Sequence, residues 1–317
     1  MRGLILIFAA GAVLSAIFCA ALIPVLKKLR AGQYILGYVE EHKAKSGTPT
    51  MGGIAFVAAA AAVAAAAGLF ADRLSAVALT FGFAYLAVGF LDDFLKFRFR
   101  RNLGLRPYQK VIFQLAIALI AGIFCYRSGL TYINIPFSGY SFDIGLWIIP
   151  LSALAFIATV NSVNLTDGLD GLAASVGFWY FAAFAALMIV LAEGRTSLSD
   201  LSVILCGVLA GYLLFNTNKA SLFMGDTGSL SLGGFAASIA VFSGNTLYII
   251  IVGIMFVLSS ISVILQVIYY KRTKKRIFLM APLHHHFQKK GYSESKIVYA
   301  YSLVTAAAGL LCLCFIL

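Results

Sequence analysis

Acidic residues are scarce in this 317-residue sequence, and five of the 12 occur in three short motifs. Asp92 and Asp93 lie in GFLDDFLK, Asp167 and Asp170 in NSVNLTDGLDG, and Asp226 in MGDTGSLSLGG. Carboxylate oxygens are ligands that Mg²⁺ accepts, usually a few at a time together with water or substrate phosphates. A bound divalent cation can polarise a phosphoryl group. These residues therefore predict a metal-assisted site for a phosphate compound, provided that the fold brings the motifs together.

The adjacent pair Asp92 and Asp93 closes the apolar run AVGFL and is predicted to end a helix there. Neighbouring residues on a helix point about 100° apart, so the two side chains would face different partners. Two such close carboxylates repel each other unless a cation lies near. In the functional interpretation, one acid handles a proton or a nucleophile while the other binds metal or holds Lys96. The alternative is a solvated helix end.

A polar island, Asn161 to Gly171, separates two long apolar runs and contains Asn161, Asn164, Asp167 and Asp170. An acid at the centre of a membrane helix costs about 2.5 to 3.5 kcal/mol on insertion scales. Such residues therefore mark a functional site or lie at the membrane interface. The island is either one wall of a site or a hydrated loop.

The third motif places Asp226 between glycines, where the backbone can approach a ligand closely. Asn216, Lys219 and Phe223 precede it in the same loop. A G-D-x-G element is common in turns, so alone it is weak. Together with the other acids it predicts an oxygen-ligand site for Mg²⁺.

Basic and hydroxyl residues accompany the acids. His284, His285 and His286 stand in APLHHHFQKKG, where imidazoles beside lysines suit phosphate oxygens. The alternative for them is an ordinary surface loop. Lys45 and Thr50 lie in one polar loop and Lys110 at a helix entry; taken singly, they are more typical of topology determinants than of ligands.

The composition identifies the elements that must position these residues. Hydrophobic residues make up 62% of the chain, the mean hydropathy is +0.96, and only 11% of residues are charged. This predicts an all-α integral membrane protein, because lipid leaves the backbone no open strand edge. No polar stretch is long enough for a soluble domain, so residues 1–317 form one membrane domain. The five cysteines all lie in apolar runs without metal-ligand spacing, which favours buried packing residues.

Ten apolar runs approach the length of about 20 residues that spans a bilayer. The predicted helices are Leu4–Leu26, Gly52–Leu69, Ser75–Leu91, Lys110–Cys125, Leu146–Val163, Leu172–Leu191, Leu198–Phe215, Ser229–Phe242, Thr246–Tyr270 and Lys296–Ile316. The eighth is short and rich in glycine, which predicts close packing or a tilt.

Basic residues divide unevenly between the two sets of loops that ten helices create. One set carries 20 Lys and Arg, and the other only Arg2, Arg73, Arg127 and Arg195. By the positive-inside rule the first set is cytoplasmic and both termini are extracytoplasmic. All five acids of the three motifs then fall on the cytoplasmic face. The net charge of +12 follows largely from this topology, so it does not indicate a nucleic acid or another anionic partner. An outer segment, Ser128 to Asp143, alternates β-formers with Gly and Ser and predicts a small β-hairpin.

As a set, the motifs GTPTMGG, GFLDDFLK, NSVNLTDGLDGLA, FNTNKASLFMGDTGSLSLGG and APLHHHF resemble the bacterial phospho-N-acetylmuramoyl-pentapeptide transferases. These belong to the polyprenyl-phosphate sugar-phosphate transferase superfamily, and the likeness covers nearly the whole chain. It implies a multi-pass enzyme of the bacterial inner membrane with its active site facing the cytoplasm. The implied reaction, part of peptidoglycan synthesis, moves phospho-MurNAc-pentapeptide from UDP-MurNAc-pentapeptide to undecaprenyl phosphate, giving lipid I and UMP with Mg²⁺. The resemblance also suggests a homodimer.

Carried over by motif position, the resemblance assigns roles to residues of this sequence. Asp226 is the expected metal ligand, and Asp92 with Asp93 is expected to activate the lipid phosphate. The remaining residues divide into a nucleotide side, namely Asn161, Asn164, Asp167, Asp170, Asn216 and Phe223, and a diphosphate and sugar side, namely Lys45, Thr50, Lys96, Lys110, His284, His285 and His286.

Two other functions stay open at this level. A sister transferase would use UDP-GlcNAc or another UDP-sugar through similar acidic motifs. An ion-coupled transporter would also need acids within helices, but near the middle of the membrane rather than at one face.

Overall fold

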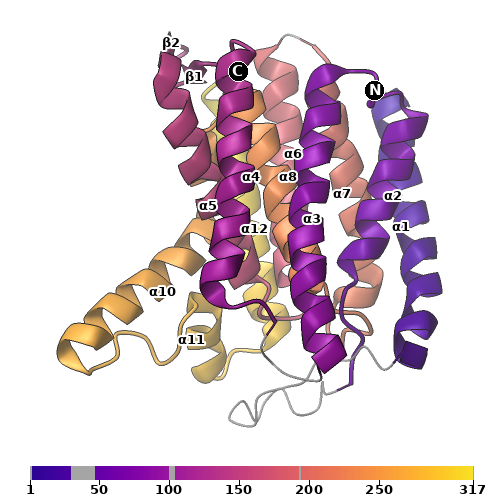
Figure 1. Cartoon of the computed structure of the whole chain (residues 1–317), viewed down its shortest axis with the longest axis vertical. Coiled ribbons are helices and arrows are strands. Elements are labelled where there is room, and N and C mark those ends of the chain that lie inside the picture. Colours follow the sequence, from indigo (N-terminus) through magenta and orange to yellow (C-terminus); the bar gives the residue numbers. More distant parts are fainter. Residues whose placement is uncertain (1, 30–46, 100–103, 193, 317) are drawn as a thin grey trace.

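The computed structural model describes residues 2–29, 47–99, 104–192 and 194–316. Most of these residues form a bundle of helices that run roughly parallel to one axis (Figure 1). The elements in chain order are α1 Arg2–Leu29, α2 Gly53–Ala66, α3 Arg73–Phe99, α4 Pro107–Arg127, β1 Tyr132–Asn134, β2 Ser141–Asp143, the 3₁₀ turn η2 Gly145–Trp147, α5 Ile148–Thr166, α6 Leu172–Leu191, α7 Ser197–Asn216, α8 Gly225–Phe242, α9 Tyr248–Val252, α10 Ile254–Thr273, α11 Leu283–Lys289 and α12 Glu294–Cys314.

Within the described residues, eight helices are long and apolar enough to cross a membrane: α1, α3, α4, α5 with η2, α6, α7, α10 and α12. The all-α membrane class is therefore confirmed. The remaining two predicted spans correspond to α2 and α8. With 14 residues, α2 is about 21 Å long by helical rise, which is less than the hydrocarbon thickness. The total of ten spans stays a prediction.

Helix α8 forms the centre of the bundle. Every residue from Thr227 to Phe242 is buried, so this helix is enclosed by protein on all sides. Small residues make that enclosure possible: a Cβ atom at Gly233 would collide with Val160 of α5, and one at Gly234 with the ring of Tyr85 on α3. The predicted close packing of this glycine-rich helix is confirmed. Its polar and small residues need no lipid-facing surface.

The ninth predicted span, Thr246–Tyr270, is not one continuous helix. It breaks at Gly253 into the short α9 and the longer α10. Glycine lacks the side chain that would hold the helical backbone, so it is a common point for such a break. Beyond the break, α10 projects sideways from the bundle (Figure 1).

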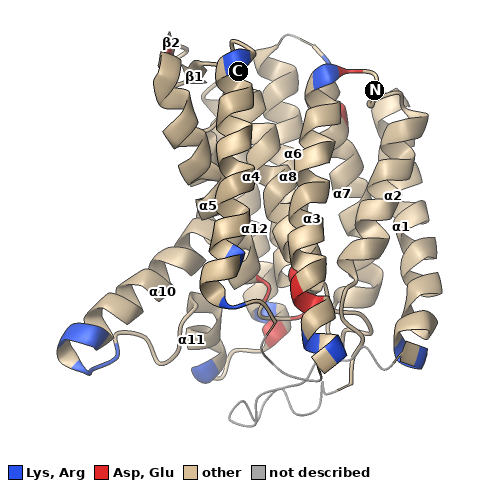
Figure 2. Cartoon of the chain, viewed as in Figure 1, with Lys and Arg blue, Asp and Glu red and all other residues tan. Residues whose placement is uncertain are grey.

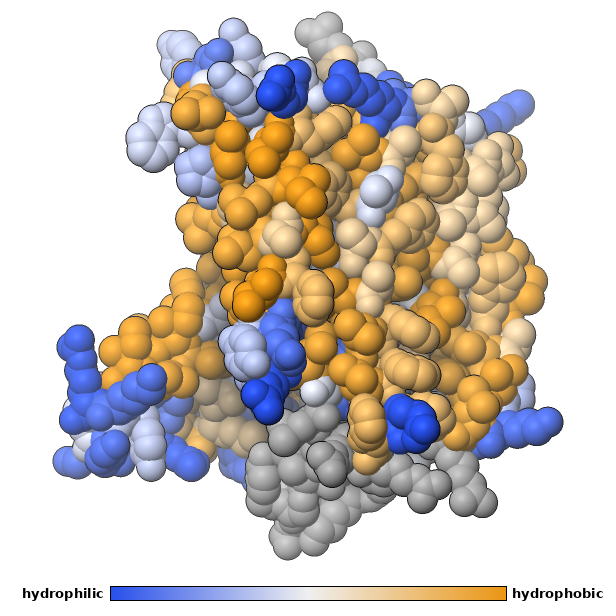
Figure 3. Space-filling model, viewed as in Figure 1, coloured by the Kyte–Doolittle hydropathy of each residue, from blue (hydrophilic) through white to orange (hydrophobic). Residues whose placement is uncertain are grey.

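The two ends of the bundle differ in charge. Both termini of the chain lie at the same end, where β1 and β2 pair antiparallel with Ile133 opposite Phe142. Figure 2 shows that most Lys and Arg of the described residues lie at the other end, together with the central acidic group. Between the ends, apolar side chains cover the visible face of the bundle (Figure 3). This pattern matches a protein that crosses a bilayer and holds its polar site at one surface.

Candidate active site

Helix extents at the site differ from the sequence prediction. Asp92 and Asp93 do not end a helix, because α3 continues to Phe99 and places both acids inside it. The residues that follow, FLKFRF, contain no helix breaker. Asp226 lies in the first turn of α8, which begins at Gly225 rather than at Ser229. The acids thus project from two packed helices instead of from loops, which fixes their positions more firmly.

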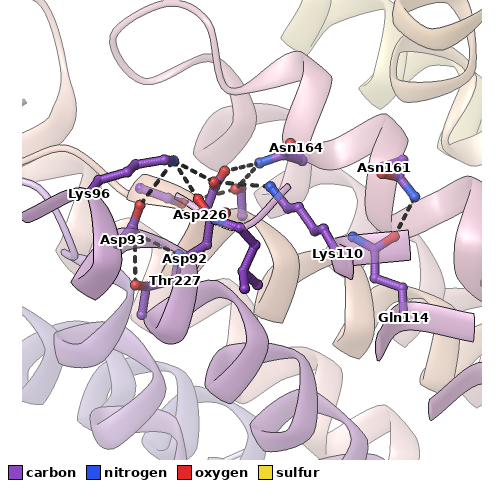
Figure 4. A network of polar contacts seen from close by, with 12 residues as sticks. Asp92, Asp93, Lys96, Lys110, Gln114, Asn161, Asn164, Asp226 and Thr227 are labelled. Carbon is purple, nitrogen blue, oxygen red and sulfur yellow. Dashed lines mark hydrogen bonds and ion pairs between the residues drawn. The ribbon is translucent and has the colours of Figure 1, made fainter. Parts of the chain in front are cut away.

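Three carboxylates meet around one ammonium group (Figure 4). Lys96 Nζ lies 2.6 Å from Asp92 Oδ2, 3.5 Å from Asp93 Oδ1 and 2.6 Å from Asp226 Oδ2. Lys110 Nζ, from α4, lies 3.0 Å from the same Asp226 oxygen. We call these five residues the acidic centre. With all five ionised, three negative charges face two positive charges, so the centre keeps an excess negative charge that would attract a cation.

Asp92 and Asp93 are each held by one carboxylate oxygen and present the other to the acidic centre. Oδ1 of Asp92 accepts a hydrogen bond from the backbone N–H of Leu105, at 2.9 Å. Oδ2 of Asp93 accepts two, from the backbone N–H and the hydroxyl of Thr227, at 2.9 and 2.8 Å. Both carboxylates are almost fully buried. These hydrogen bonds offset part of the cost of burying charge and fix the direction of the remaining oxygens.

Asp226 is oriented by α5. Asn164 donates its side-chain N–H to Asp226 Oδ1 at 2.6 Å and also contacts the Ser229 hydroxyl at 2.8 Å. Asn161 lies one turn earlier on α5 and bonds Gln114 of α4 at 2.7 Å instead of an acid (Figure 4). The two predicted asparagines therefore have different contacts. Asn164 belongs to the site, whereas Asn161 joins α5 to α4.

The acidic centre fits a divalent cation by its donor set. One oxygen from each of Asp92, Asp93 and Asp226 lies within 4.8 Å of the others. Carboxylate oxygens suit the hard cation Mg²⁺, which binds through few protein ligands and keeps positions for water or substrate phosphate. Asp226 is the most exposed of the three, with 14% of its side chain accessible. Its role as a metal ligand stays a prediction.

A left-handed glycine brings the first loop to this centre. Gly225 has φ +69°, and a Cβ atom there would collide with Asp93 Oδ2 and lie against the Thr50 hydroxyl. Thr50 therefore lies beside the acidic centre. Lys45 lies outside the described residues.

The other predicted nucleotide-side residues, namely Asp167, Asp170, Asn216 and Phe223, form a second group beside the first. Asn216 is buried, and its side chain accepts from the Gly171 N–H at 3.1 Å and donates to the Leu222 carbonyl at 2.9 Å. Asp170 accepts from the Ala220 N–H at 3.0 Å. These bonds tie the loop after α5 to the loop after α7. Both residues therefore shape the wall of the site.

Asp167 and Phe223 complete this wall. Asp167 follows the last residue of α5, and burial, together with the charges of Asp226 and Asp93, raises its pKa well above the usual range. Phe223 is half-buried, and its backbone is fixed by a 2.8 Å bond from its N–H to the Pro49 carbonyl and another from the Gly52 N–H to its own carbonyl. The backbone of Phe223 is thus held at the junction of two loops.

The three histidines lie on the short helix α11 and do not share one environment. A Cβ atom at Gly168 would collide with His284 Nε2 and would crowd His285 Nε2, so both imidazoles reach the loop that carries Asp167. His286 turns away and accepts the Leu279 N–H at 3.1 Å. The structure therefore brings two of the three predicted histidines to the site and uses the third to fix the preceding segment.

Some residues at the site escaped the sequence prediction. Thr227, which holds Asp93, follows Asp226 directly in the G-D-T-G-S motif, and its proximity was an available signal. Gln114 lies one turn after Lys110 on the same face of α4, which periodicity could have revealed. Leu105 acts through its backbone, and no side-chain pattern marks it.

The family model for glycosyl transferase family 4 matches residues 75–244, more than half of the chain, and includes all members of the acidic centre. A phospho-N-acetylmuramoyl-pentapeptide-transferase signature matches residues 45–57, a stretch that includes Thr50 and the start of α2.

Several whole proteins similar to this chain carry the name phospho-N-acetylmuramoyl-pentapeptide-transferase. One from Clostridium botulinum (strain Alaska E43 / Type E3) is 42% identical over 306 residues, covering 96% of this chain and 93% of that protein. One from Shouchella clausii (strain KSM-K16) is 44% identical over 308 residues, covering 95% and 92%. One from Caldanaerobacter subterraneus subsp. tengcongensis is 43% identical over 287 residues, covering 90% of each.

Proposed function

This chain belongs to the phospho-N-acetylmuramoyl-pentapeptide transferase family, and we propose on that basis that it makes lipid I in peptidoglycan synthesis. It transfers phospho-MurNAc-pentapeptide from UDP-MurNAc-pentapeptide to undecaprenyl phosphate and releases UMP. An oxygen of the lipid phosphate bonds to the phosphorus next to the sugar, and the bond from that phosphorus to the UMP oxygen breaks.

The observation that carries the mechanism is the acidic centre. Phosphoryl transfer depends mainly on positioning and on neutralising charge, and both are available here. Lys96 and Lys110 supply positive charge to the diphosphate, while Asp92 and Asp93 activate the lipid phosphate. Asp226, with Asp92 and Asp93 beside it, would hold Mg²⁺, and the ion would neutralise the diphosphate charge.

The nucleotide side of the substrate lies along the second group of residues. Asp167, Asp170 and Asn216 line or shape this wall, and the Phe223 ring offers a face on which uracil can stack. His284 and His285 reach the same loop and approach the diphosphate and sugar.

The membrane placement follows from charge. The end of the bundle with the acidic centre carries most of the basic residues, which supports a cytoplasmic active site and extracytoplasmic termini. The membrane is then the bacterial inner membrane, where a lipid phosphate can enter between helices. The homodimer suggested by the resemblance is part of this proposal, to be checked by the mass of the detergent-solubilised protein.

One assay separates this function from its rivals. Purified protein receives undecaprenyl phosphate, Mg²⁺ and either UDP-MurNAc-pentapeptide or UDP-GlcNAc, and UMP release is measured. Release with the pentapeptide nucleotide alone is expected. Release with UDP-GlcNAc alone would identify a sister transferase, and release with neither substrate would favour a transporter. The signature match at residues 45–57 already favours the pentapeptide nucleotide.

A further inference from the structure

The outer end of α10 and the turn after it carry a dense group of positive charge. We call residues 271–276 the basic tip; it contains Lys271, Arg272, Lys274, Lys275 and Arg276. The sequence holds no acidic residue between Asp226 and Glu294. Within the described parts of the chain, none of the five basic side chains forms an ion pair, and all five residues are exposed. Figure 2 shows this group at the far end of α10, apart from the acidic centre.

Apolar residues flank the basic tip on both sides. Along α10 the last buried residue is Ser262, and further out Val267 and Ile268 are 45% and 48% exposed. After the tip, Ile277 and Leu279 are 48% and 52% exposed. We call these two flanks the apolar limbs. Figure 3 shows apolar side chains along the projecting arm and hydrophilic ones at its outer end.

The two limbs are bonded to each other, so the arrangement is a defined turn. Gln266 Oε1 accepts from the backbone N–H groups of Ile277 and Phe278 at 3.1 and 2.9 Å. Further along, the Leu283 N–H donates to the Ser262 hydroxyl at 3.0 Å. The chain reverses at Lys274, whose φ is +58°. It therefore leaves the bundle along α10 and returns beside it, with the positive charge confined to the turn.

A turn with apolar flanks and a basic tip is most stable at a membrane surface. Exposed aliphatic limbs are stable in hydrocarbon, while Lys and Arg reach to the headgroup level. Tyr269 and Tyr270 lie at the junction of limb and tip, and tyrosine is enriched at that depth. Basic residues near an anionic membrane surface each contribute about 1 kcal/mol of attraction. A soluble acidic partner would match the charge of the tip but not the apolar limbs.

We propose that the basic tip and its apolar limbs form a binding site for anionic phospholipids of the bilayer, with the headgroup on the tip and the acyl chains along the limbs. The occupant is a bulk phospholipid rather than the lipid acceptor, because the tip lies apart from the acidic centre (Figure 2). The site would anchor the outer end of α10, which makes few contacts with the rest of the protein there. This proposal does not depend on the transferase reaction.

Fluorescence quenching by brominated lipids tests the proposal at the site itself. The exposed Trp147 and Trp179 are changed to Phe, and Ile277→Trp provides the reporter. The protein is reconstituted in phosphatidylcholine with equal, low fractions of either brominated phosphatidylglycerol or brominated phosphatidylcholine. Brominated phosphatidylglycerol is expected to quench the fluorescence of the reporter clearly more than brominated phosphatidylcholine does. In Lys274→Gln/Lys275→Gln, its apparent affinity should fall about fivefold for each lysine removed.

A matched control removes equal charge elsewhere. Lys27→Gln/Lys28→Gln, at the exposed end of α1, should leave quenching at the reporter unchanged. The proposal is overturned if both double variants lower the quenching equally, or if the two brominated lipids quench alike. It is also overturned if equimolar undecaprenyl phosphate displaces phosphatidylglycerol from the reporter, because the occupant would then be the acceptor. No sugar nucleotide is present, so the outcome is independent of catalysis.

Discussion

Lys96 occupies the position between three carboxylates that a cation would be expected to take. Its ammonium group contacts Asp92, Asp93 and Asp226, whereas Lys110 contacts Asp226 alone. One side chain therefore balances most of the repulsion that would otherwise separate the acids. In the proposed reaction the same lysine neutralises diphosphate charge. Lys96 would therefore contact the carboxylates when no substrate is bound and the diphosphate when substrate is bound.

Asp226→Asn is expected to lower the rate of transfer by about 100-fold or more, because it weakens the hold on the cation that would neutralise the diphosphate charge. The change keeps the size of the side chain, so the thermal unfolding midpoint should stay near that of the parent. UMP release at saturating Mg²⁺ is the measurement. Asp200→Asn, in the first turn of α7, is the matched control and should remain active. Full activity of the purified Asp226 variant would refute the metal assignment.

Lys96→Gln is expected to bind a divalent cation about tenfold more tightly than the parent, because the ammonium no longer competes for the three carboxylates. Titration with Mn²⁺, followed by the electron paramagnetic resonance of the unbound ion, measures this without any turnover. Lys110→Gln removes the same charge but only one contact, so its gain should be smaller. Equal or weaker Mn²⁺ binding in Lys96→Gln would contradict the competition.

At the scale of elements, the site depends on how closely α3 and α8 approach. A Cβ atom at Gly89 would collide with the backbone of Asp226 and Thr227, so the glycine lets the two helices touch where their acids meet. Gly53 of α2 makes a similar approach to Gly228 of α8. The acidic centre is therefore a product of backbone packing as much as of side-chain chemistry.

Gly89→Ala is expected to destabilise the protein by about 1 to 3 kcal/mol, the usual cost of overpacking, and to lower activity by displacing Asp226. The measurements are the thermal midpoint in detergent and the rate of UMP release. Gly177→Ala on α6 is the control, because its new Cβ would meet only the flexible ends of Leu232 and Leu209, at 3.2 and 3.3 Å. A stable and fully active Gly89 variant would count against close packing as the positioning device.

Sequence reasoning located most of these elements because apolar runs of membrane length are plain to read. It could not place the end of α3, since no breaker stands between Asp93 and Phe99 and helices continue through polar residues when a partner helix receives them. The break at Gly253 was hidden for a related reason: glycine is common within membrane helices and only packing decides whether it bends them. The grouping of Asp92, Asp93 and Asp226 was predicted as a shared face, and a contact of Lys96 with one of the adjacent acids was among the alternatives. The contact of Lys96 with all three carboxylates, and the hydrogen bonds from Thr227 to Asp93, needed the tertiary structure.

For the whole molecule, function depends on which end of the bundle faces the nucleotide. The end with the acidic centre also carries the basic tip and most other basic residues (Figure 2). The opposite end carries both termini and the β1–β2 pair (Figure 1). The UDP-linked substrate of the proposed reaction is soluble and made inside the cell, so it would reach only a cytoplasmic site. The distribution of charge and the proposed reaction therefore favour the same orientation.

Cysteine labelling in sealed cells tests this orientation. In a Cys314→Ser background, which removes the exposed native thiol, Lys274→Cys and Tyr140→Cys each place one thiol at an exposed position at opposite ends. An impermeant maleimide should label the Tyr140 variant from outside and the Lys274 variant only after the membrane is opened. The reverse pattern would overturn the topology and, with it, the cytoplasmic site.

The full enclosure of α8 has a consequence for how the protein is made. Helix α8 is rich in Gly and Ser and carries Asp226 in its first turn, so its transfer from the translocon into lipid is barely favourable. As an isolated segment it should therefore insert into the membrane poorly. Its partners α3 and α5 are synthesised earlier and can receive it as it emerges. The helix that carries the proposed metal ligand would then enter the membrane by docking onto protein already there. An insertion assay should show residues 225–242 integrating poorly alone and efficiently when the preceding helices are present.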